Sequence, residues 1–461
     1  MKLLPEAIIG EFKSNFQGDA LIPGDAGYEE VRQIWNAMID RRPVLIGRCI
    51  SPEDVANAVR FSRKHNLLVS VRGGGHNIAG NAVCDDGLMI DLSLMKSIHV
   101  DPKVKRATVE PGCTLADLDA ATQKHGLATP LGINSTTGVA GLTLGGGFGW
   151  LSRKFGMTID NLLSADVVTA DGNQLHASET ENSDLFWGLR GGGGNFGIVT
   201  NFEFQLHPVG PNVLSGLIVF PFDEAKSVIT QFARFTETMP DDLNIWMVSR
   251  KAPPLPFLPE AVHGNTVVVL AIFYAGDPAE GEKLIEPLRG FGTPHGEQIG
   301  VQPFTAWQQT FDPLLTKGAR NYWKSHNFSR LSDGVIETMI EFAGTLPLPQ
   351  CEIFIGTMGG QTTRVAPEAM AYSNRDANYV MNVHGRWESA ADDARCISWA
   401  REFFTRSKPF ASNGAYINFL TEEETNRIAS AYGSNYNRLV ELKQKYDPTN
   451  HFRMNQNIRP V

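Results

Sequence analysis

Short apolar runs alternate with helix-like patterns over the first two hundred residues. Residues 44–47 and 67–71 are apolar runs of strand length, and apolar residues recur at helical spacing between them. Ser51 and Pro52 mark where that helix begins, because serine caps a first turn and proline fits the first helical position. The order predicts a β-α-β unit whose second strand runs into the glycine run 73–75. Ligands bind at the carboxyl ends of strands in such units.

The pattern changes near residue 210, where prolines and a glycine interrupt it. Beyond that point strands and helices alternate with longer connections, which predicts a separate segment of mixed structure. The predicted strands are 214–220, 244–249, 266–274, 321–328, 351–356 and 378–383, and the predicted helices are 223–237, 278–290, 332–343 and 390–406. In the last fifty residues we expect a strand at 415–419, then two helices ending near residue 445. The chain should therefore divide into residues 1–210, 211–411 and 412–461.

Composition excludes several classes of protein. Hydrophobic residues make up 42% of the chain and charged residues 20%, which is typical of a folded soluble protein. Lys and Arg number 41 against 50 for Asp and Glu, with no basic block, so we expect neither nucleic acid nor a membrane as partner. The five cysteines have no paired spacing, so no metal site or disulfide framework is predicted. The N-terminal residues lack the apolar run of a secretory signal, which favours a cytoplasmic protein.

The 45 glycines are clustered in runs. The three longest runs are Gly73–Gly75, Gly145–Gly147 and Gly191–Gly194. Tight turns alone would explain any one of them. Each run lies beside a predicted strand, however, and none is followed by the lysine of a P-loop. Exposed backbone N–H groups in such loops can bind a pyrophosphate without lysine. The sequence therefore favours a dinucleotide cofactor.

Arg72-Gly73-Gly74-Gly75-His76-Asn77 resembles the RGGGH flavin-attachment motif of berberine-bridge-enzyme-like oxidases. These are FAD proteins of the vanillyl-alcohol-oxidase, or PCMH-type, superfamily. Residues 138–147 and 184–199 resemble the second and third FAD loops of this family, and 415–418 and 446–457 resemble its C-terminal segment. The resemblance implies an α+β fold with two lobes. An FAD-binding lobe would be built from both ends of the chain, with an antiparallel-sheet substrate domain inserted between them.

The resemblance also implies roles for single residues. His76 would bond covalently to the flavin 8α-methyl carbon, the alternative being a histidine that only caps the strand end. Asn134 stands where many relatives carry a second attachment cysteine, so one bond is expected. Thr137 replaces the usual Val or Leu beside the oxygen-reacting face, and Leu142 occupies a place often taken by His. The cofactor-binding residues implied are Arg72, Gly73, Gly74, Gly75, His76, Asn77, Gly80, Thr137, Gly138, Gly141, Gly146, Gly147, Ile198, Val199, Tyr416, Asn418 and Asn455.

Tyr416 is the candidate general base. A free phenol has a pKa near about 10, so it needs nearby positive charge or hydrogen bonds to act at neutral pH. Arg364 is a candidate source of that charge, because alignment on Gly359-Gly360 places it where ring-closing relatives carry a glutamate base. A buried structural tyrosine and a solvated surface arginine are the alternatives. Aromatic and histidine residues of one predicted strand, namely Tyr322, Trp323, His326 and Phe328, are further candidates for the substrate site, or else belong to the core.

The resemblance implies an FAD-dependent oxidoreductase. Hydride would pass from a C–H beside a hydroxyl, in an alcohol, sugar or secondary metabolite, to flavin N5, and O2 would re-oxidise the flavin to give peroxide. A dehydrogenase with another electron acceptor, a non-redox cyclase or isomerase, and a flavin-binding protein without catalysis remain open. No metal is expected. The sequence says nothing of the oligomeric state.

Overall fold

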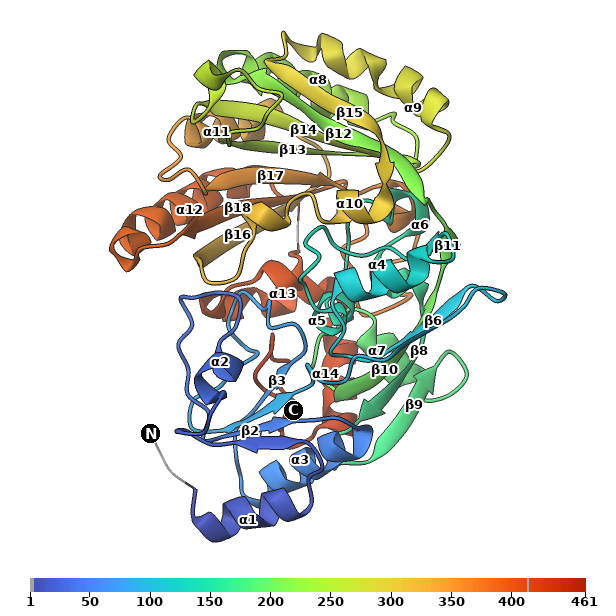
Figure 1. Ribbon diagram of the computed structural model, residues 1–461, viewed down its shortest axis with the longest axis vertical. Helices are drawn as coiled ribbons and strands as arrows, with labels where there is room; N and C mark the ends of the chain where they lie inside the picture. Colours follow the sequence, from blue (N-terminus) through green and yellow to red (C-terminus); the bar gives the residue numbers. More distant parts are fainter. Residues whose placement is uncertain (1–3, 413) are drawn as a thin grey trace.

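The first part of the chain forms two larger sheets and a two-stranded one, the pair of β7 and β11, with their helices, drawn in blue to green in the lower half of Figure 1. The structure is a computed structural model that describes residues 4–412 and 414–461. The strands of this lobe are β1 (Asp19–Leu21), β2 (Leu45–Arg48), β3 (Val69–Arg72), β4 (Leu88–Asp91), β5 (Ile98–Asp101), β6 (Arg106–Val109), β7 (Leu127–Ala128), β8 (Leu162–Val168), β9 (Gln174–Ser178), β10 (Ile198–Gln205) and β11 (His207–Pro208). One sheet has the order β1-β2-β4-β3, with β2, β4 and β3 parallel. The other is antiparallel, in the order β5-β6-β10-β8-β9.

The helices of this lobe are interspersed with its strands along the chain, and the one after Ser51 begins at the cap that the sequence predicts. They are α1 (Glu6–Ser14), α2 (Tyr28–Arg32), α3 (Pro52–Lys64), α4 (Leu115–Gln123), α5 (Val139–Leu144), α6 (Ser152–Phe155) and α7 (Ser183–Leu189). The Ser51 side chain accepts a hydrogen bond from the Asp54 N–H at the start of α3. Thr114 and Asp117 form a reciprocal capping box on α4. These caps fix the helices that flank the glycine loops.

The central part of the chain forms a seven-stranded antiparallel sheet, in the upper half of Figure 1. Its strands are β12 (Asn212–Pro221), β13 (Leu243–Lys251), β14 (Thr266–Tyr274), β15 (Gly296–Pro303), β16 (Arg320–Phe328), β17 (Glu352–Thr357) and β18 (Tyr379–Trp387), in the order β15-β12-β14-β13-β17-β18-β16. Helices α8 (Ala225–Thr236), α9 (Pro278–Ile285), α11 (Asp333–Ala343) and α12 (Asp393–Ser407) cover its outer face, and α10 (Phe304–Gln308) lies at the seam with the other lobe. The predicted α+β fold with an antiparallel central sheet is confirmed.

The edge strand β15 was not predicted from the sequence. Its residues are half or fully exposed along the whole strand, and it holds few apolar side chains. It is a strand because it pairs with β12 from Asn212 to Val219. Pairing with β12 therefore determines that β15 is a strand, and no local apolar pattern in the sequence indicates it.

The C-terminal segment returns to the lower lobe, as the red elements of Figure 1 show. Its helices α13 (Ile428–Tyr432) and α14 (Tyr436–Tyr446) pack into the same core as β6, β8 and β10. The predicted strand at 415–419 is wrong, because residues Ile417–Phe419 form a 3-10 turn. The Phe419 N–H donates to the Tyr416 carbonyl instead of to a neighbouring strand. The segment lies against a glycine loop, which offers no strand edge for pairing.

Arg153 joins the two lobes at their seam. Its guanidinium is buried and donates to three backbone carbonyls of the central segment, those of Leu243, Met239 and Met358. The lobes are therefore held together beside the cavity described below. Within residues 4–412 and 414–461, no helix has the length and apolar content needed to span a membrane.

Candidate cofactor and substrate site

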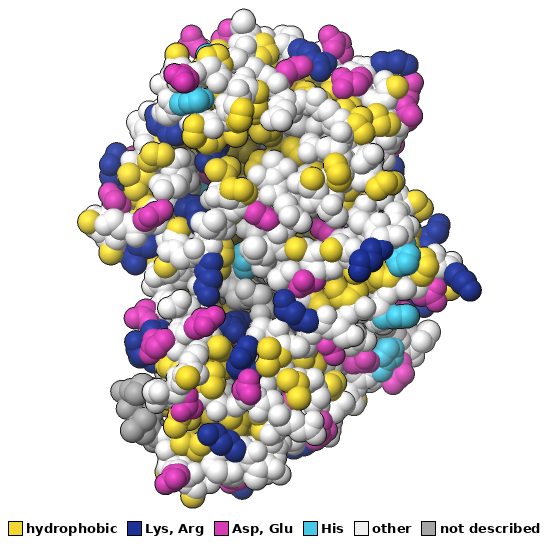
Figure 2. All heavy atoms as spheres, in the orientation of Figure 1, with side chains coloured by type: hydrophobic (Ala, Val, Ile, Leu, Met, Phe, Trp, Pro, Cys, Tyr) yellow, Lys and Arg dark blue, Asp and Glu magenta, His cyan; other side chains and the backbone are white. Residues whose placement is uncertain are grey.

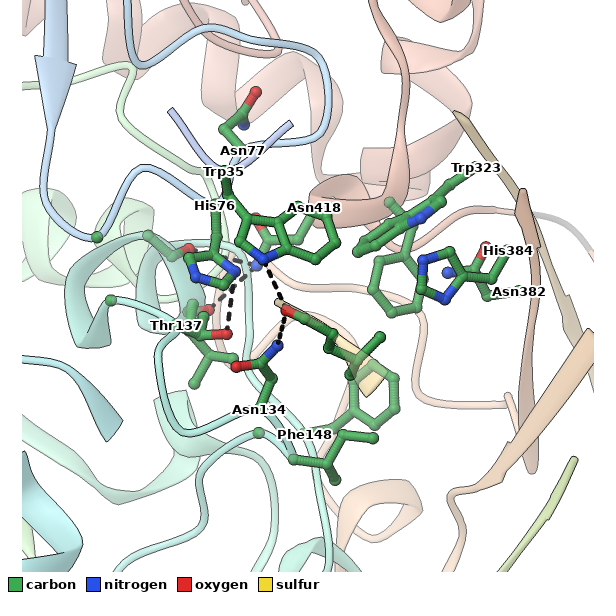
Figure 3. Close-up of a pocket in the computed structure, with 18 of the residues that line it drawn as sticks. Trp35, His76, Asn77, Asn134, Thr137, Phe148, Trp323, Asn382, His384 and Asn418 are labelled. Carbon is green, nitrogen blue, oxygen red and sulfur yellow. Dashed lines mark hydrogen bonds between the residues drawn. The ribbon is translucent and has the colours of Figure 1, made fainter. Parts of the chain in front are cut away.

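A cavity of about 510 Å³ lies between the two lobes, and residues of both lobes line it. The lower wall comes from the loop after β3, from the segment between α4 and α5, and from the third glycine run. The upper wall is the inner face of the seven-stranded sheet. Figure 3 shows His76, Asn134 and Thr137 on one side and Trp323, Asn382 and His384 on the other. The cavity thus joins the sequence motifs to the central segment.

The first two glycine loops touch each other through their backbones. A Cβ on Gly74 would lie 2.3 Å from the Gly138 nitrogen, so a side chain at either glycine would force the loops apart. Among the described residues, the N–H groups of Gly74, Gly75 and His76 donate to no backbone acceptor. Successive free N–H groups of this kind form an anion-binding concavity. The loop therefore suits the pyrophosphate of a dinucleotide.

Two further glycines leave space for a large group. Gly141 and Gly194 line the cavity, and a Cβ on either would meet nothing within 4 Å. A side chain there would project into the cavity and occupy the place of a ligand. The Asn455 side-chain oxygen is also buried without a partner in the described chain. These features fit a bulky cofactor held mainly by backbone groups.

His76 lies at the mouth of the first glycine loop. Its ring stacks on Trp35, with centroids 5.1 Å apart. Its Nε2 lies 3.0 Å from the Thr136 hydroxyl and its Nδ1 lies 3.5 Å from the Thr137 hydroxyl. Burial lowers the pKa of His76 to about 4, so the ring is neutral at physiological pH. A neutral imidazole keeps one nitrogen lone pair available as a nucleophile.

Tyr416 is 2% exposed and lines the same cavity. Its hydroxyl oxygen accepts two hydrogen bonds, from the Gly147 N–H at 3.1 Å and from the Asn418 amide at 3.1 Å. Burial raises the pKa of Tyr416 to about 12, and these two donors oppose that rise. The phenol is therefore neutral at rest, and its oxygen has donors in place to stabilise a phenolate.

Most of the predicted cofactor-binding residues line the cavity. Those that do are Gly73, Gly74, Gly75, His76, Asn77, Thr137, Gly138, Gly141, Ile198, Val199, Tyr416, Asn418 and Asn455. Arg72 lies behind the wall, where its guanidinium pairs with buried Asp91. Gly80, Gly146 and Gly147 also lie behind it, and their positive φ angles shape the turns that carry the lining residues. These four support the wall and do not form its surface.

The expected place of Arg364 is wrong. Its side chain is 59% exposed and pairs with Asp241 outside the cavity. Alignment on Gly359-Gly360 misplaced it, because Gly360–Thr363 form a 3-10 turn and Arg364, which ends this turn, does not line the cavity. Of the four aromatic and histidine candidates on β16, Trp323 lines the cavity, whereas Tyr322 and Phe328 belong to the core under the helices. His326 stacks on Phe404 of α12.

The site also contains residues that the sequence analysis missed. Trp35, Phe148 and Trp246 line the cavity, and Phe148 packs edge-on against Tyr416 with centroids 4.9 Å apart. Asn382 and His384 line it from β18. A signal for the last two was present, since polar residues alternate with apolar ones along this strand. No local signal marks Trp35, which reaches His76 only through the fold.

Comparisons with known proteins agree with this geometry. A family model described as FAD binding domain matches residues 43–178, and one described as berberine and berberine like matches residues 415–459. An FAD-linked oxidoreductase of Dictyostelium discoideum is 33% identical over 98% of this chain and 97% of its own length. The chain belongs to the berberine-bridge-enzyme-like FAD-linked oxidoreductases.

Other members of this berberine-bridge-enzyme-like family are similar over their whole length. (R)-6-hydroxynicotine oxidase of Paenarthrobacter nicotinovorans is 31% identical over 97% of both chains. The crystal structure of 6-hydroxy-D-nicotine oxidase from Arthrobacter nicotinovorans superposes with a TM-score of 0.87 at 29% identity, covering 97% of this chain and 98% of that one. The structure of a chitooligosaccharide oxidase superposes with a TM-score of 0.86 at 25% identity, covering 99% and 100%. This protein is accordingly an FAD-binding oxidoreductase of that fold.

Proposed function

We propose that this enzyme oxidises a C–H bond beside a hydroxyl group, with FAD attached through His76 alone and O2 as the electron acceptor. The observation that carries the proposal is the shared cavity, which brings neutral His76, the free N–H groups of its loop and Tyr416 together. FAD bound there supplies the acceptor for the hydride that leaves the substrate carbon.

Single attachment is supported by the environment of His76. Asn134 occupies the position of the second attachment residue, and its amide donates to the Leu315 carbonyl while its oxygen accepts from Thr136. All five cysteines are free and buried, and none of them lines the cavity within the described residues. His76 is thus the nucleophile that the chain offers to the cofactor.

Tyr416 is the group we propose to accept the substrate hydroxyl proton. The Gly147 N–H and the Asn418 amide hold its oxygen and would stabilise the phenolate as the proton arrives or leaves. Removal of the hydroxyl proton by the phenolate form of Tyr416, and loss of hydride from the carbon that bears the hydroxyl, would convert the alcohol to a carbonyl compound, with FAD supplying the hydride acceptor. Charge from Arg364 has no part in this step, because that residue lies outside the cavity.

Two measurements test the proposal. Acid-precipitated protein should remain yellow, and digestion should release a single flavinylated peptide that contains His76. Substrate alcohols should bleach the flavin absorbance under anaerobic conditions, and air should restore it with release of peroxide. Flavin lost wholly to the supernatant contradicts the covalent bond. Product formed without bleaching points to the non-redox alternative, and bleaching that air does not reverse points to a dehydrogenase with another acceptor.

A further inference from the structure

The inner face of the seven-stranded sheet forms the upper wall of the cavity, and its character changes from one side to the other. Part of each of β12, β13, β14, β17 and β18 lines the cavity with alternate residues, while residues on the opposite face of the sheet pack under the outer helices. On the β12 and β14 side the wall is aliphatic. The residues there, with those of the loop that follows β13, are Leu217, Val219, Val248, Leu255, Leu258, Val267 and Val269.

The β17 and β18 side of the wall is polar but carries balanced charge. The Arg250 guanidinium donates to the Glu352 carboxylate at 2.8 Å, and His384 Nδ1 lies 3.3 Å from the other carboxylate oxygen. His384 Nε2 lies 3.2 Å from the Asn321 side-chain oxygen. These groups therefore pair with one another through hydrogen bonds and opposite charge. An ionic ligand would lose its hydration here without finding a countercharge.

Asn382 differs from these paired groups. It is 1% exposed and lines the cavity, yet neither its amide nitrogen nor its amide oxygen has a partner among the described residues. Its cross-strand neighbours are Ser325 and Phe354. Trp323 and Trp246 also line the cavity, and their indole N–H groups are likewise unpartnered within the described chain. Buried polar groups left unpaired are costly, so each calls for a ligand atom or water.

We propose that the substrate is an uncharged, largely apolar alcohol, whose hydrogen-bonding group is held by Asn382 and whose apolar body lies along the aliphatic strip of β12, β13 and β14. A hydroxyl both donates and accepts, so it matches the amide oxygen and the amide nitrogen of Asn382. A saccharide carries hydroxyls on every side, and the aliphatic strip offers them no partners. This proposal rests on the proposed oxidation, because it assigns the substrate class of the same cavity.

The test uses the flavin-loaded enzyme and four probes that share a primary or secondary hydroxyl. Cinnamyl alcohol is neutral and apolar, 4-(hydroxymethyl)benzoate is an anion, 4-(aminomethyl)benzyl alcohol is a cation, and xylobiose is a sugar. Binding is read from quenching of tryptophan fluorescence, since Trp246 and Trp323 line the cavity, and from the shift of the flavin absorbance. Cinnamyl alcohol should bind at least about tenfold more tightly than each of the others, the ratio expected when one charged or polar group goes unpaired.

Asn382→Val should weaken cinnamyl alcohol binding by about tenfold to a hundredfold, because the variant loses both hydrogen bonds. Asn327→Val is the matched control. Asn327 lies on the same sheet face, is fully buried and is also unpartnered in the described chain, but it does not line the cavity. This control should bind the probe as the wild type does. Asn382→Asp adds a second readout, since an anion at this place should favour 4-(aminomethyl)benzyl alcohol over cinnamyl alcohol.

Each outcome decides the proposal. Tighter binding of an ion or of xylobiose overturns it, as does wild-type binding by Asn382→Val or an unchanged preference in Asn382→Asp. If cinnamyl alcohol binds but does not bleach the flavin under anaerobic conditions, the proposed substrate class is supported and only the proposed oxidation is contradicted. Bleaching by xylobiose but not by cinnamyl alcohol would support the proposed oxidation and contradict the apolar substrate.

Discussion

Tyr416→Phe removes one oxygen atom from the cavity wall and leaves the packing of the ring in place. In the wild type that oxygen accepts hydrogen bonds from the Gly147 N–H and the Asn418 amide. Each donor left without an acceptor costs about 1–3 kcal/mol, so the variant should be less stable while it still folds and retains flavin. If Tyr416 is the proton acceptor, flavin reduction should slow by about 10²- to 10⁴-fold. That loss corresponds to about 3–5 kcal/mol of transition-state stabilisation.

The assay is anaerobic stopped-flow reduction of the flavin at saturating substrate. Burial raises the pKa of Tyr416 to about 12, so the phenolate fraction grows throughout the pH range in which the protein is folded. The wild-type reduction rate should therefore rise with pH without reaching a plateau, and the Phe variant should lose this rise. A reduction rate near that of the wild type in Tyr416→Phe would refute the assignment, and so would a wild-type rate that is independent of pH.

Tyr28→Phe is the matched control for the loss of a buried hydroxyl. Tyr28 is fully buried, and its hydroxyl donates to the Pro43 carbonyl at 2.7 Å in the lower lobe, away from the cavity. Its removal should lower the free energy of unfolding by an amount similar to that for Tyr416→Phe. Its flavin reduction should stay at the wild-type rate. Comparison of the two variants separates a chemical role from a loss of stability.

Three further predictions concern the cofactor bond, pH and thiols. His76→Ala should release its flavin on acid precipitation, and retention of yellow colour in the pellet would contradict attachment at that residue. Burial raises the pKa of Asp119 to about 7, above an unfolded value of about 3.9. The free energy of unfolding should therefore fall as pH rises from about 4 to about 7, by at most about 4 kcal/mol. Asp119→Asn, whose amide oxygen can still accept from Gln308, should unfold in urea with much less change between acidic and mildly alkaline pH. Thiol titration of denatured, unreduced protein should find all five of Cys49, Cys84, Cys113, Cys351 and Cys396, and a lower number would indicate disulfides.

The glycine loops could be predicted from the sequence because each is visible as a run of glycines in a short stretch, although one of their contacts is between distant loops. Gly74 and Gly138 lie where two backbones touch, and Gly146 and Gly147 have positive φ angles, so no other residue type fits easily. The caps of α3 and α4 were predictable for the same reason, since their donors and acceptors lie within three residues of each other. Glycine runs and helix caps can be recognised from a few consecutive residues.

Features that depend on distant partners could not be predicted in this way. Residues 415–419 contain apolar and aromatic residues in a strand-like pattern, but the structure places them against a glycine loop where no strand is available. Arg364 was placed by counting from two glycines, and a 3-10 turn directs it to Asp241. The role proposed for Asn382 depends on its side chain having no hydrogen-bond partner among the residues that the structure describes. Sequence spacing contains none of this information.

The return of the chain to its first lobe has a consequence for biosynthesis. The core beneath β6, β8 and β10 includes Ala415, Leu439 and Ile458, so residues as far as Ile458 must leave the ribosome before that core can close. Tyr416 and Asn455 reach the cavity at the same late moment. The β-α-β unit that carries His76 is synthesised before these residues. Until they are synthesised, the lobe that contains this unit has an incomplete core. We therefore expect flavin to bind only after these residues have been synthesised, so that under riboflavin limitation the protein should accumulate as a colourless chain that proteases cleave more readily.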